Sequence, residues 1–302
     1  MPLLYLLLAG CRSEMPPSPT APPVDEAPVM KPFSISADQI TARNSSFGDA
    51  DVDRLLADPA LSTVRMLDLT GAHLSAVALD RLLSDPRLAE LKTLYLGSST
   101  IGDAGLLAIA QSPAAPHLET LHVPRVEATP AGIAAFAEQA RFAAISLSIG
   151  HQAVGDVGAI GLAACTGITT LDLESAQVGT VGAVALLSQT SAASLSLRDN
   201  PIHLDGLQAF SPALTSISFK MTMLTEADLV RLSSAAAPAL QELNFEQVPI
   251  TDGGLAAIRE AGWLGQLQAL SIGAPATSAA ARRAFLAVWG GDRWISIQRR
   301  DL

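Results

Sequence analysis

His122, Ser146 and Asp172 are the residue types of a nucleophilic triad: a general base, a hydroxyl nucleophile and an orienting carboxylate. Each follows an aliphatic residue in a short stretch whose alternation predicts a strand. Neighbouring parallel strands lie about 4.8 Å apart, which places Ser146 between the other two and Asp172 roughly 10 Å from His122. A working triad needs the histidine in the middle, so we expect no catalysis at these residues.

Other catalytic and metal chemistry finds little support in the sequence. The five histidines, His73, His117, His122, His151 and His203, form no pair with cysteine at metal-ligand spacing. Carboxylates alternate at Asp172 and Glu174 and again at Glu242 and Glu246, but glycosidase chemistry also needs a cleft, and sugar binding an aromatic platform. Cys165 is expected to be a small buried apolar residue. We therefore predict no enzyme activity, no metal and no cofactor.

The outward side chains of neighbouring strands offer a binding surface instead. An acidic, then basic, then acidic stripe is predicted across four strands; its members are Asp172, Glu174, Arg198, Lys220, Glu242, Asn244 and Glu246. Tyr95 and His122 form a separate candidate anchor. Binding hot spots favour Tyr, Trp and Arg, so Tyr95 and Arg198 are the strongest single candidates. The alternative is that these charges only keep the sheet soluble.

The element that positions these residues is clearest at residues 240–258. Leu243 and Phe245 alternate with Asn244, which predicts a short strand. Thr251 is a helix-capping residue type, and Asp252 follows where the helix dipole favours a negative charge. Leu255 and Ile258 share one face of the helix that we expect to follow. Strand, loop and helix bury one apolar side only against a copy of themselves.

Such copies recur to the C-terminus at steps of 22 to 27 residues. The predicted strand pairs begin at Ile40, Leu67, Leu94, Leu121, Ile145, Leu171, Leu195, Ile217, Leu243, Leu270 and Ile295. Helix entries follow at Phe47, Leu74, Ile101, Ala128, Val154, Val178, Ile202, Leu224, Ile250 and Ala276, most with a capping residue or Gly next, Thr277 among them. The loop at residues 149–152 is expected to be longer by two residues. A Gly four residues after the entry, as at Gly132 and Gly206, predicts close approach to the neighbouring unit.

A period of 20–29 residues with Leu-rich strands is typical of leucine-rich repeats. Ile250-Thr251-Asp252-Gly253-Gly254-Leu255 and Ile101-Gly102-Asp103-Ala104-Gly105-Leu106 resemble the ribonuclease-inhibitor-like and cysteine-containing types. The fold class is therefore predicted as α/β, a curved horseshoe solenoid of about eleven units. Helices pack about 8–10 Å apart and strands about 4.8 Å, so the strands take the concave face, on an inner arc of roughly 50 Å.

This sequence departs from the family at one loop position, five residues after the first strand Leu, where Cys or Asn is common. Here that position holds Ala72, Ser99, Val126, Ala176, Thr222 and Val248, and only Asn200 fits. We expect the loop ladder to be closed in another way.

Residues 1–11 end in Leu8-Ala9-Gly10-Cys11, which resembles the lipobox of a bacterial lipoprotein signal peptide. The resemblance implies a lipid anchor on Cys11, and Arg12 in place of Asp favours the outer membrane. Residues 12–32 contain seven prolines, a composition typical of an extended tether. The alternatives are an ordinary apolar N-terminus with an incidental cysteine and a disordered tail.

Residues 33–302 are predicted to form the repeat domain with its two caps. Phe33 begins the N-terminal cap. Trp289 and Trp294 are expected to pack in the C-terminal cap, with Arg282, Arg283, Arg293, Arg299 and Arg300 on its polar face or in a basic spot for an acidic partner. The net charge of −10 and the absence of a large basic cluster argue against nucleic-acid binding.

The leading hypothesis is a non-catalytic, lipid-anchored module of the bacterial cell envelope that binds a protein or peptide through its concave face. The alternatives are an envelope scaffold without a diffusible ligand and a soluble cytoplasmic interaction module.

Overall fold

The computed structural model describes residues 33–43, 46–273, 276–290 and 294–298. The chain divides into two units, Met1–Lys31 and Pro32–Leu302, and all described elements lie in the second. The predictions for Cys11 and for the Pro-rich segment 12–32 fall outside the described residues. Within the described ranges, no helix combines the length and apolar character needed to cross a bilayer.

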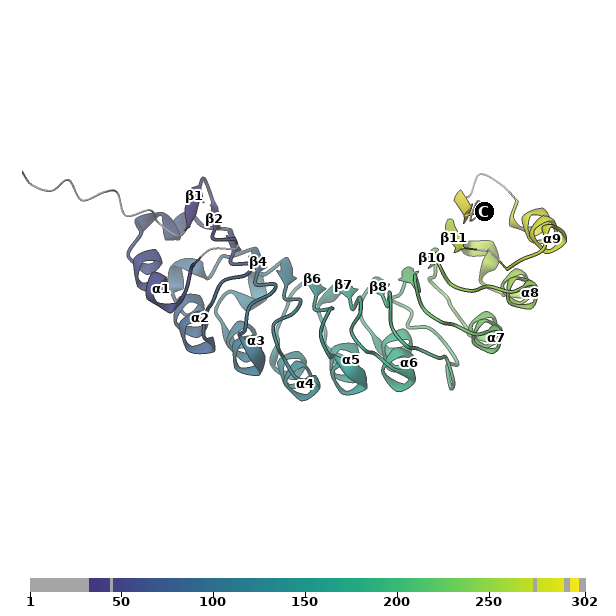
Figure 1. Cartoon of the computed structure of the whole chain (residues 1–302), viewed down its shortest axis with the longest axis horizontal. Coiled ribbons are helices and arrows are strands. Elements are labelled where there is room, and N and C mark those ends of the chain that lie inside the picture. Colours follow the sequence, from purple (N-terminus) through teal and green to yellow (C-terminus); the bar gives the residue numbers. More distant parts are fainter. Residues whose placement is uncertain (1–32, 44–45, 274–275, 291–293, 299–302) are drawn as a thin grey trace, which may run out of the picture. The chain divides into compact units, whose positions relative to one another are not determined.

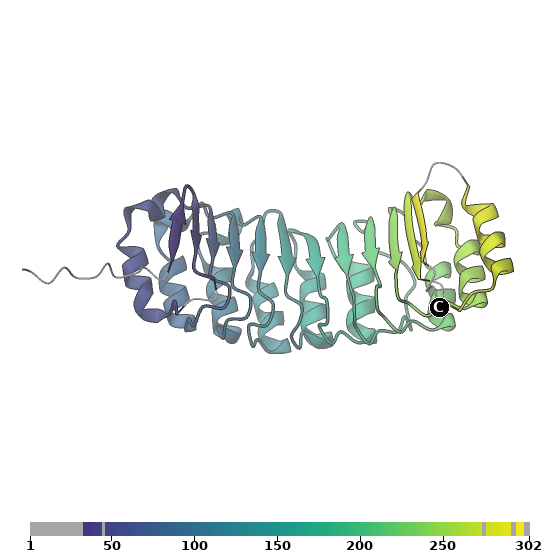
Figure 2. The ribbon, with the colours of Figure 1, turned by 45° about the horizontal axis from the view of Figure 1, so that its top comes forward.

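One sheet of twelve strands runs through the described residues, with the strands side by side in sequence order (Figure 2). They are β1 (Ser34–Ser36), β2 (Gln39–Thr41), β3 (Met66–Asp68), β4 (Thr93–Tyr95), β5 (Thr120–His122), β6 (Ile145–Ser148), β7 (Ile168–Asp172), β8 (Ser194–Ser196), β9 (Ser216–Ser218), β10 (Glu242–Phe245), β11 (Ala269–Gly273) and β12 (Trp294–Gln298). β1 pairs antiparallel with β2, and each later pair is parallel. The predicted α/β solenoid is confirmed.

Helices cover the opposite, convex side of the solenoid (Figure 1). The described residues contain α1 (Asp49–Leu56), α2 (Ala76–Leu83), α3 (Gly102–Gln111), α4 (Pro130–Gln139), α5 (Gly155–Ala164), α6 (Thr180–Gln189), α7 (Glu226–Ser234), α8 (Asp252–Glu260) and α9 (Ala279–Trp289). Short 3-10 helices lie at Pro59–Thr63, Pro86–Leu88, Ala115–His117 and Leu264–Gln266. The core lies between the two layers, and both predicted core residues of α8, Leu255 and Ile258, are buried.

The register aligns one apolar residue from each of the strands β2 to β12. In sequence order these are Ile40, Leu67, Leu94, Leu121, Leu147, Leu171, Leu195, Ile217, Leu243, Leu270 and Ile295. The prediction of Ile145 in this series was wrong, because β6 begins two residues before the aligned position and its pairing with β7 is irregular between Ile145 and Ser146. Leu147 to Val154 is then the ordinary spacing, so the loop at 149–152 is not lengthened.

Helix starts follow the predicted capping residues in four units. The hydroxyls of Ser75, Thr129, Thr225 and Thr251 each accept a backbone N–H from the first turn. The prediction of Thr277 as a cap was wrong, since Ser278 caps α9 and Thr277 is buried. No helix follows Ile202, and Gly206 lies in a turn with a φ of +89° and no atom near its Cβ position.

A carboxylate in the first turn of a helix often reaches the cap of the next helix. Asp103 accepts the backbone N–H of Thr129 at 2.7 Å, and Asp252 accepts that of Ser278 at 2.6 Å. A Cβ on Gly132 would collide with Asp103 at 2.0 Å, so the predicted close approach is confirmed there. These hydrogen bonds link consecutive units on the convex side and lower the pKa of Asp252.

Two amide side chains close the loop ladder in their own units. Asn200 donates to three carbonyl oxygens at 2.8–3.0 Å and accepts two backbone N–H groups at 3.0 and 3.1 Å. Gln152 holds the equivalent position after β6, donates to two carbonyls and accepts the N–H of Val126. Ser99 and Thr222 each donate to the carbonyl three residues earlier. Gln152 therefore does in its unit what Asn200 does in its own.

The two ends of the solenoid differ from the interior units. Phe33 is buried and its ring lies 5.9 Å from that of Phe47, beside β1. At the other end, Trp289 is buried and stacks on Phe285 at 6.2 Å. The prediction that Trp294 packs in the cap was wrong, because its side chain is 57% exposed on β12. Arg283 is exposed, whereas Arg293, Arg299 and Arg300 lie outside the described residues.

Candidate functional site on the concave face

The strands place one outward side chain per unit in a row along the concave face. From β2 to β12 these are Thr41, Asp68, Tyr95, His122, Ser148, Asp172, Ser196, Ser218, Asn244, Ser271 and Ser296. Ser148 takes the place that was predicted for Ser146, which pairs instead with Thr120 and Thr170. The correction follows from the shifted register of β6.

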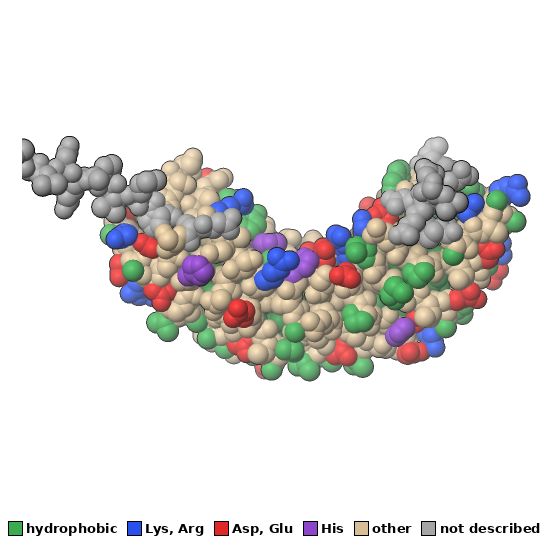
Figure 3. Space-filling model, viewed as in Figure 1, with side chains coloured by type: hydrophobic (Ala, Val, Ile, Leu, Met, Phe, Trp, Pro, Cys, Tyr) green, Lys and Arg blue, Asp and Glu red, His purple; other side chains and the backbone are tan. Residues whose placement is uncertain are grey.

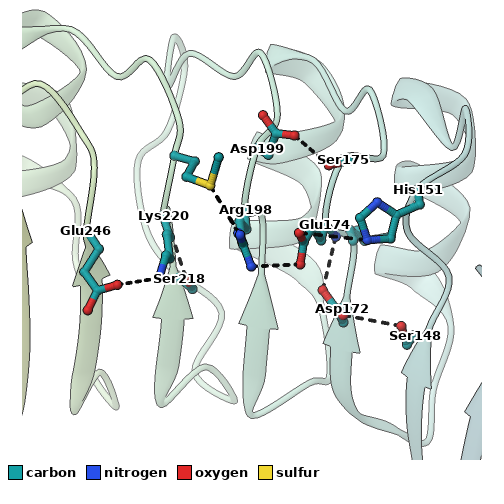
Figure 4. A network of polar contacts seen from close by, with 12 residues as sticks. Ser148, His151, Asp172, Glu174, Ser175, Arg198, Asp199, Ser218, Lys220 and Glu246 are labelled. Carbon is teal, nitrogen blue, oxygen red and sulfur yellow. Dashed lines mark hydrogen bonds and ion pairs between the residues drawn. The ribbon is translucent and has the colours of Figure 1, made fainter.

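Four charged side chains form a second row two residues further on, where the chain leaves the strands (Figure 4). They are Glu174, Arg198, Lys220 and Glu246. Arg198 Nη1 lies 3.3 Å from Glu174 Oε2, and Lys220 Nζ lies 2.5 Å from Glu246 Oε2. Two cations therefore stand side by side between two carboxylates, and we call these four residues the ionic row.

Turns at the strand ends orient the two carboxylates of the ionic row. Asp172 Oδ1 accepts the backbone N–H of Glu174 at 3.1 Å, and Asn244 Oδ1 accepts that of Glu246 at 2.8 Å. Such side-chain-to-backbone turns fix the direction of the chain where the ladder ends. The outward residue of a strand thus positions the charged residue that follows it.

Two residues outside the predicted set, Met221 and His151, contact members of the ionic row. The sulfur of Met221 lies 3.4 Å from both Nε and Nη2 of Arg198, and Met221 is itself 38% exposed. His151 Nε2 lies 3.9 Å from Glu174 Oε1, an ion pair when the imidazole is protonated. Neither residue belongs to the alternating strand positions, so the strand pattern gives no signal for them.

Glu242 is separated from the ionic row. It begins β10, is exposed, and accepts the hydroxyl of Ser216 at 3.0 Å. The predicted stripe of seven residues therefore splits into the ionic row, the two turn residues Asp172 and Asn244, and Glu242 near the opposite end of its strand.

Tyr95 and His122 are brought together as predicted for the anchor. Their ring centroids lie 5.7 Å apart with an interplanar angle of 63°, an edge-to-face arrangement. Burial lowers the pKa of His122, the charges of Asp172 and Asp68 oppose this, and His151 adds to it. The net effect is a lowered pKa, so the imidazole is neutral at pH 7.

The arrangement of His122, Ser148 and Asp172 is not that of a triad. Ser148 lies between the other two in the register and donates to Asp172 Oδ2 at 3.3 Å. Across the described residues, no hydrogen bond joins His122 to either partner. The Ser148 hydroxyl is therefore paired with a carboxylate and not with the imidazole of His122.

The described ranges also carry neither a metal-ligand cluster nor a thiol with a lowered pKa. No group of three or more His, Cys, Asp or Glu side chains there is arranged to hold a metal ion. Cys165 is buried beside the end of α5, as predicted, and burial raises the pKa of its thiol. It is a free cysteine.

Comparison with known proteins agrees with the repeat architecture. The family model described as "Leucine Rich repeat" matches residues 90–110 and 164–187. No curated protein matches the chain. Together, the register and the family match define a leucine-rich-repeat solenoid.

Two solved structures are similar to this chain at low sequence identity. One is described as the Rad7 and Elc1 complex in yeast: 14% identity, a TM-score of 0.42, and coverage of 78% of this chain and 69% of that chain. The other is described as the TLR13–ssRNA13 complex: 14% identity, a TM-score of 0.38, and coverage of 73% of this chain and 37% of that chain. Likeness at this level concerns the fold alone.

Proposed function

We propose that the chain is a non-catalytic interaction module that binds a protein or peptide through its concave face. The ionic row carries this proposal. Its side chains are half-buried and held by one another and by strand-end turns. Charged side chains that are already held in place give an interface specificity and a defined orientation. They also lower the cost of binding, because less side-chain entropy is lost when the partner arrives.

Site-specific photocrosslinking tests the proposal. A photoreactive amino acid at Ser196, on the concave strand β8, is expected to give a discrete adduct in the native host. The matched control is Val77, which is 78% exposed on the convex helix α2. Reversing the two central charges with Arg198→Glu and Lys220→Glu is expected to abolish the Ser196 adduct. Absence of any adduct at Ser196, or equal adducts at both positions, contradicts the proposal.

We further propose that Cys11 is lipidated, that this lipid anchors the module at the bacterial cell envelope, and that the Pro-rich segment 12–32 is the tether between the two. The support is the lipobox-like sequence ending at Cys11 and the proline content that follows it. Acyl labelling with membrane fractionation of wild type and Cys11→Ala tests this. Both label and membrane association are expected to depend on Cys11; an unlabelled, soluble wild type refutes the anchor and leaves the cytoplasmic alternative.

A further inference from the structure

Asp68 shows how an aspartate at the outward position of a strand holds a guanidinium. Its Oδ1 accepts the backbone N–H of Thr70 at 3.1 Å, which closes the strand-end turn. Its Oδ2 accepts Nε of Arg43, whose side chain reaches over from the preceding unit and stays 63% exposed. One carboxylate oxygen thus serves the backbone and the other binds the cation.

Asp172 repeats half of this arrangement four strands away. Its Oδ1 accepts the backbone N–H of Glu174 at 3.1 Å, as Asp68 does with Thr70. Its Oδ2 receives only the Ser148 hydroxyl at 3.3 Å, and within the described residues no cation lies within 4.0 Å of it. The nearby guanidinium of Arg198 is directed to Glu174 instead. Asp172 therefore presents a half-buried negative oxygen in the position where Asp68 holds an arginine.

Two aromatic rings lie on the strands between these aspartates. Tyr95 on β4 and His122 on β5 lie in register between Asp68 and Asp172 and contact each other edge to face. A guanidinium stacks on aromatic faces while its N–H groups bind a carboxylate, which a compact ammonium does less well. His122 is neutral at pH 7 because its pKa is lowered, so it does not repel a cation.

We propose that Asp172, Tyr95 and His122 together form a recognition site for an arginine side chain of the partner protein. Asp172 Oδ2 accepts the guanidinium N–H groups across the position of Ser148. The ring of His122 supplies the aromatic surface, and Tyr95 packs edge to face against the far side of that ring. The net charge of −10 favours approach of a basic segment. This proposal rests on the proposed function, since it names the chemistry of the partner at that same concave face.

The test is a titration of N-acetyl-arginine amide followed by NMR of the His122 and Tyr95 ring resonances. Saturable shifts are expected, with weaker binding of N-acetyl-lysine amide and none of N-acetyl-citrulline amide, which has nearly the same shape without the charge. Asp172→Asn is expected to weaken arginine binding about five- to ten-fold, the usual effect of losing one charge-assisted contact.

The chain offers matched controls for this variant. Asn244 already closes the same strand-end turn with its amide oxygen, so Asp172→Asn removes the charge and keeps the turn. Glu242→Gln removes an exposed carboxylate elsewhere on the concave face and is expected to leave the titration unchanged. Unchanged thermal unfolding of both variants shows that the fold is intact.

Three results overturn the proposal: no saturable shift, equal binding of arginine and citrulline, or equal binding by wild type and Asp172→Asn. Failure here and failure of the proposed function are distinguishable. If the Ser196 photoadduct forms while the arginine titration fails, the concave face binds its partner through other chemistry and the arginine site is refuted.

Discussion

Side chains with several backbone partners hold the loops of this solenoid, and Asp228 is the most buried carboxylate among them. It is 1% exposed and accepts the backbone N–H groups of Leu204 and Thr225, the Thr225 hydroxyl and Nδ1 of His203. Burial alone would raise the pKa of Asp228, but these hydrogen bonds outweigh it and bring the pKa to about 2. The charged carboxylate is therefore more stable in the folded protein than in the unfolded chain.

Asp228→Asn is expected to lower the free energy of unfolding by about 2 kcal/mol at neutral pH, the value of a pKa shift from 3.8 to about 2. Because the folded pKa is depressed, this stabilisation is full above pH 4 and is lost as the pH falls toward 2. Urea unfolding of both proteins between pH 2 and 6 measures it. The two curves are expected to converge at low pH, and a constant difference down to pH 2 contradicts the assignment.

The residue scale is also where sequence prediction erred. Ile145 and Leu147 are both buried aliphatic residues on one strand, so alternation alone does not say which one aligns with its neighbours. Because Ile145 was chosen, Ser148 was not predicted as an outward residue of the concave face, nor Gln152 as a residue of the loop ladder. The spacing from Leu147 to Val154, equal to that from Leu121 to Ala128, is the signal that distinguishes them.

At the scale of elements, the unit after β8 departs from the pattern, because its segment from Ile202 to Leu214 forms no helix. This unit has the shortest step in the chain, 22 residues from Leu195 to Ile217, and His203 stands where other units have a capping residue or Gly. A helix and its return loop need more chain than this. The other helices and all eleven predicted strands formed because each unit carries its own alternation and, in most cases, its own cap.

Gly206→Ala tests the backbone of that unit, and Gly265→Ala, in the 3-10 helix Leu264–Gln266, is its matched control. A Cβ at either position meets nothing within 4 Å, but only Gly206 has a positive φ, +89°. Side chains other than Gly are strained there, so Gly206→Ala is expected to destabilise the protein by about 1 kcal/mol or more. Gly265→Ala is expected to be neutral or slightly stabilising. Chemical denaturation measures both, and equal effects would show that the turn at Gly206 adopts another conformation.

At the scale of the whole chain, repetition made the architecture predictable while the binding site remained a hypothesis. The same pattern recurs eleven times, so the error in the predicted register of one strand, β6, did not change the predicted fold. The ionic row depends on side-chain directions that only the register and the strand-end turns fix, as with Glu174 and Arg198. Pairings such as Met221 with Arg198 come from loops that carry no alternation.

The missing helix divides the convex layer into α1–α6 and α7–α9, because the segment between them has no helix to pack on either neighbour. Stability in a solenoid is close to a sum of units and their interfaces with neighbours. We therefore expect the two blocks to unfold with different midpoints. The three tryptophans, Trp263, Trp289 and Trp294, lie in the C-terminal block, so fluorescence reports that block and far-UV circular dichroism reports both.

Ile258→Ala in α8 and Leu106→Ala in α3 test this division, since each removes a fully buried side chain from one block. Such truncations cost about 2–5 kcal/mol. Ile258→Ala is expected to lower the fluorescence midpoint more than the dichroism midpoint. Leu106→Ala is expected to shift only the dichroism. If each variant moves both midpoints equally, the sheet and the hydrogen bonds of Asn200 and Asp228 couple the blocks into one cooperative unit despite the interrupted helix layer.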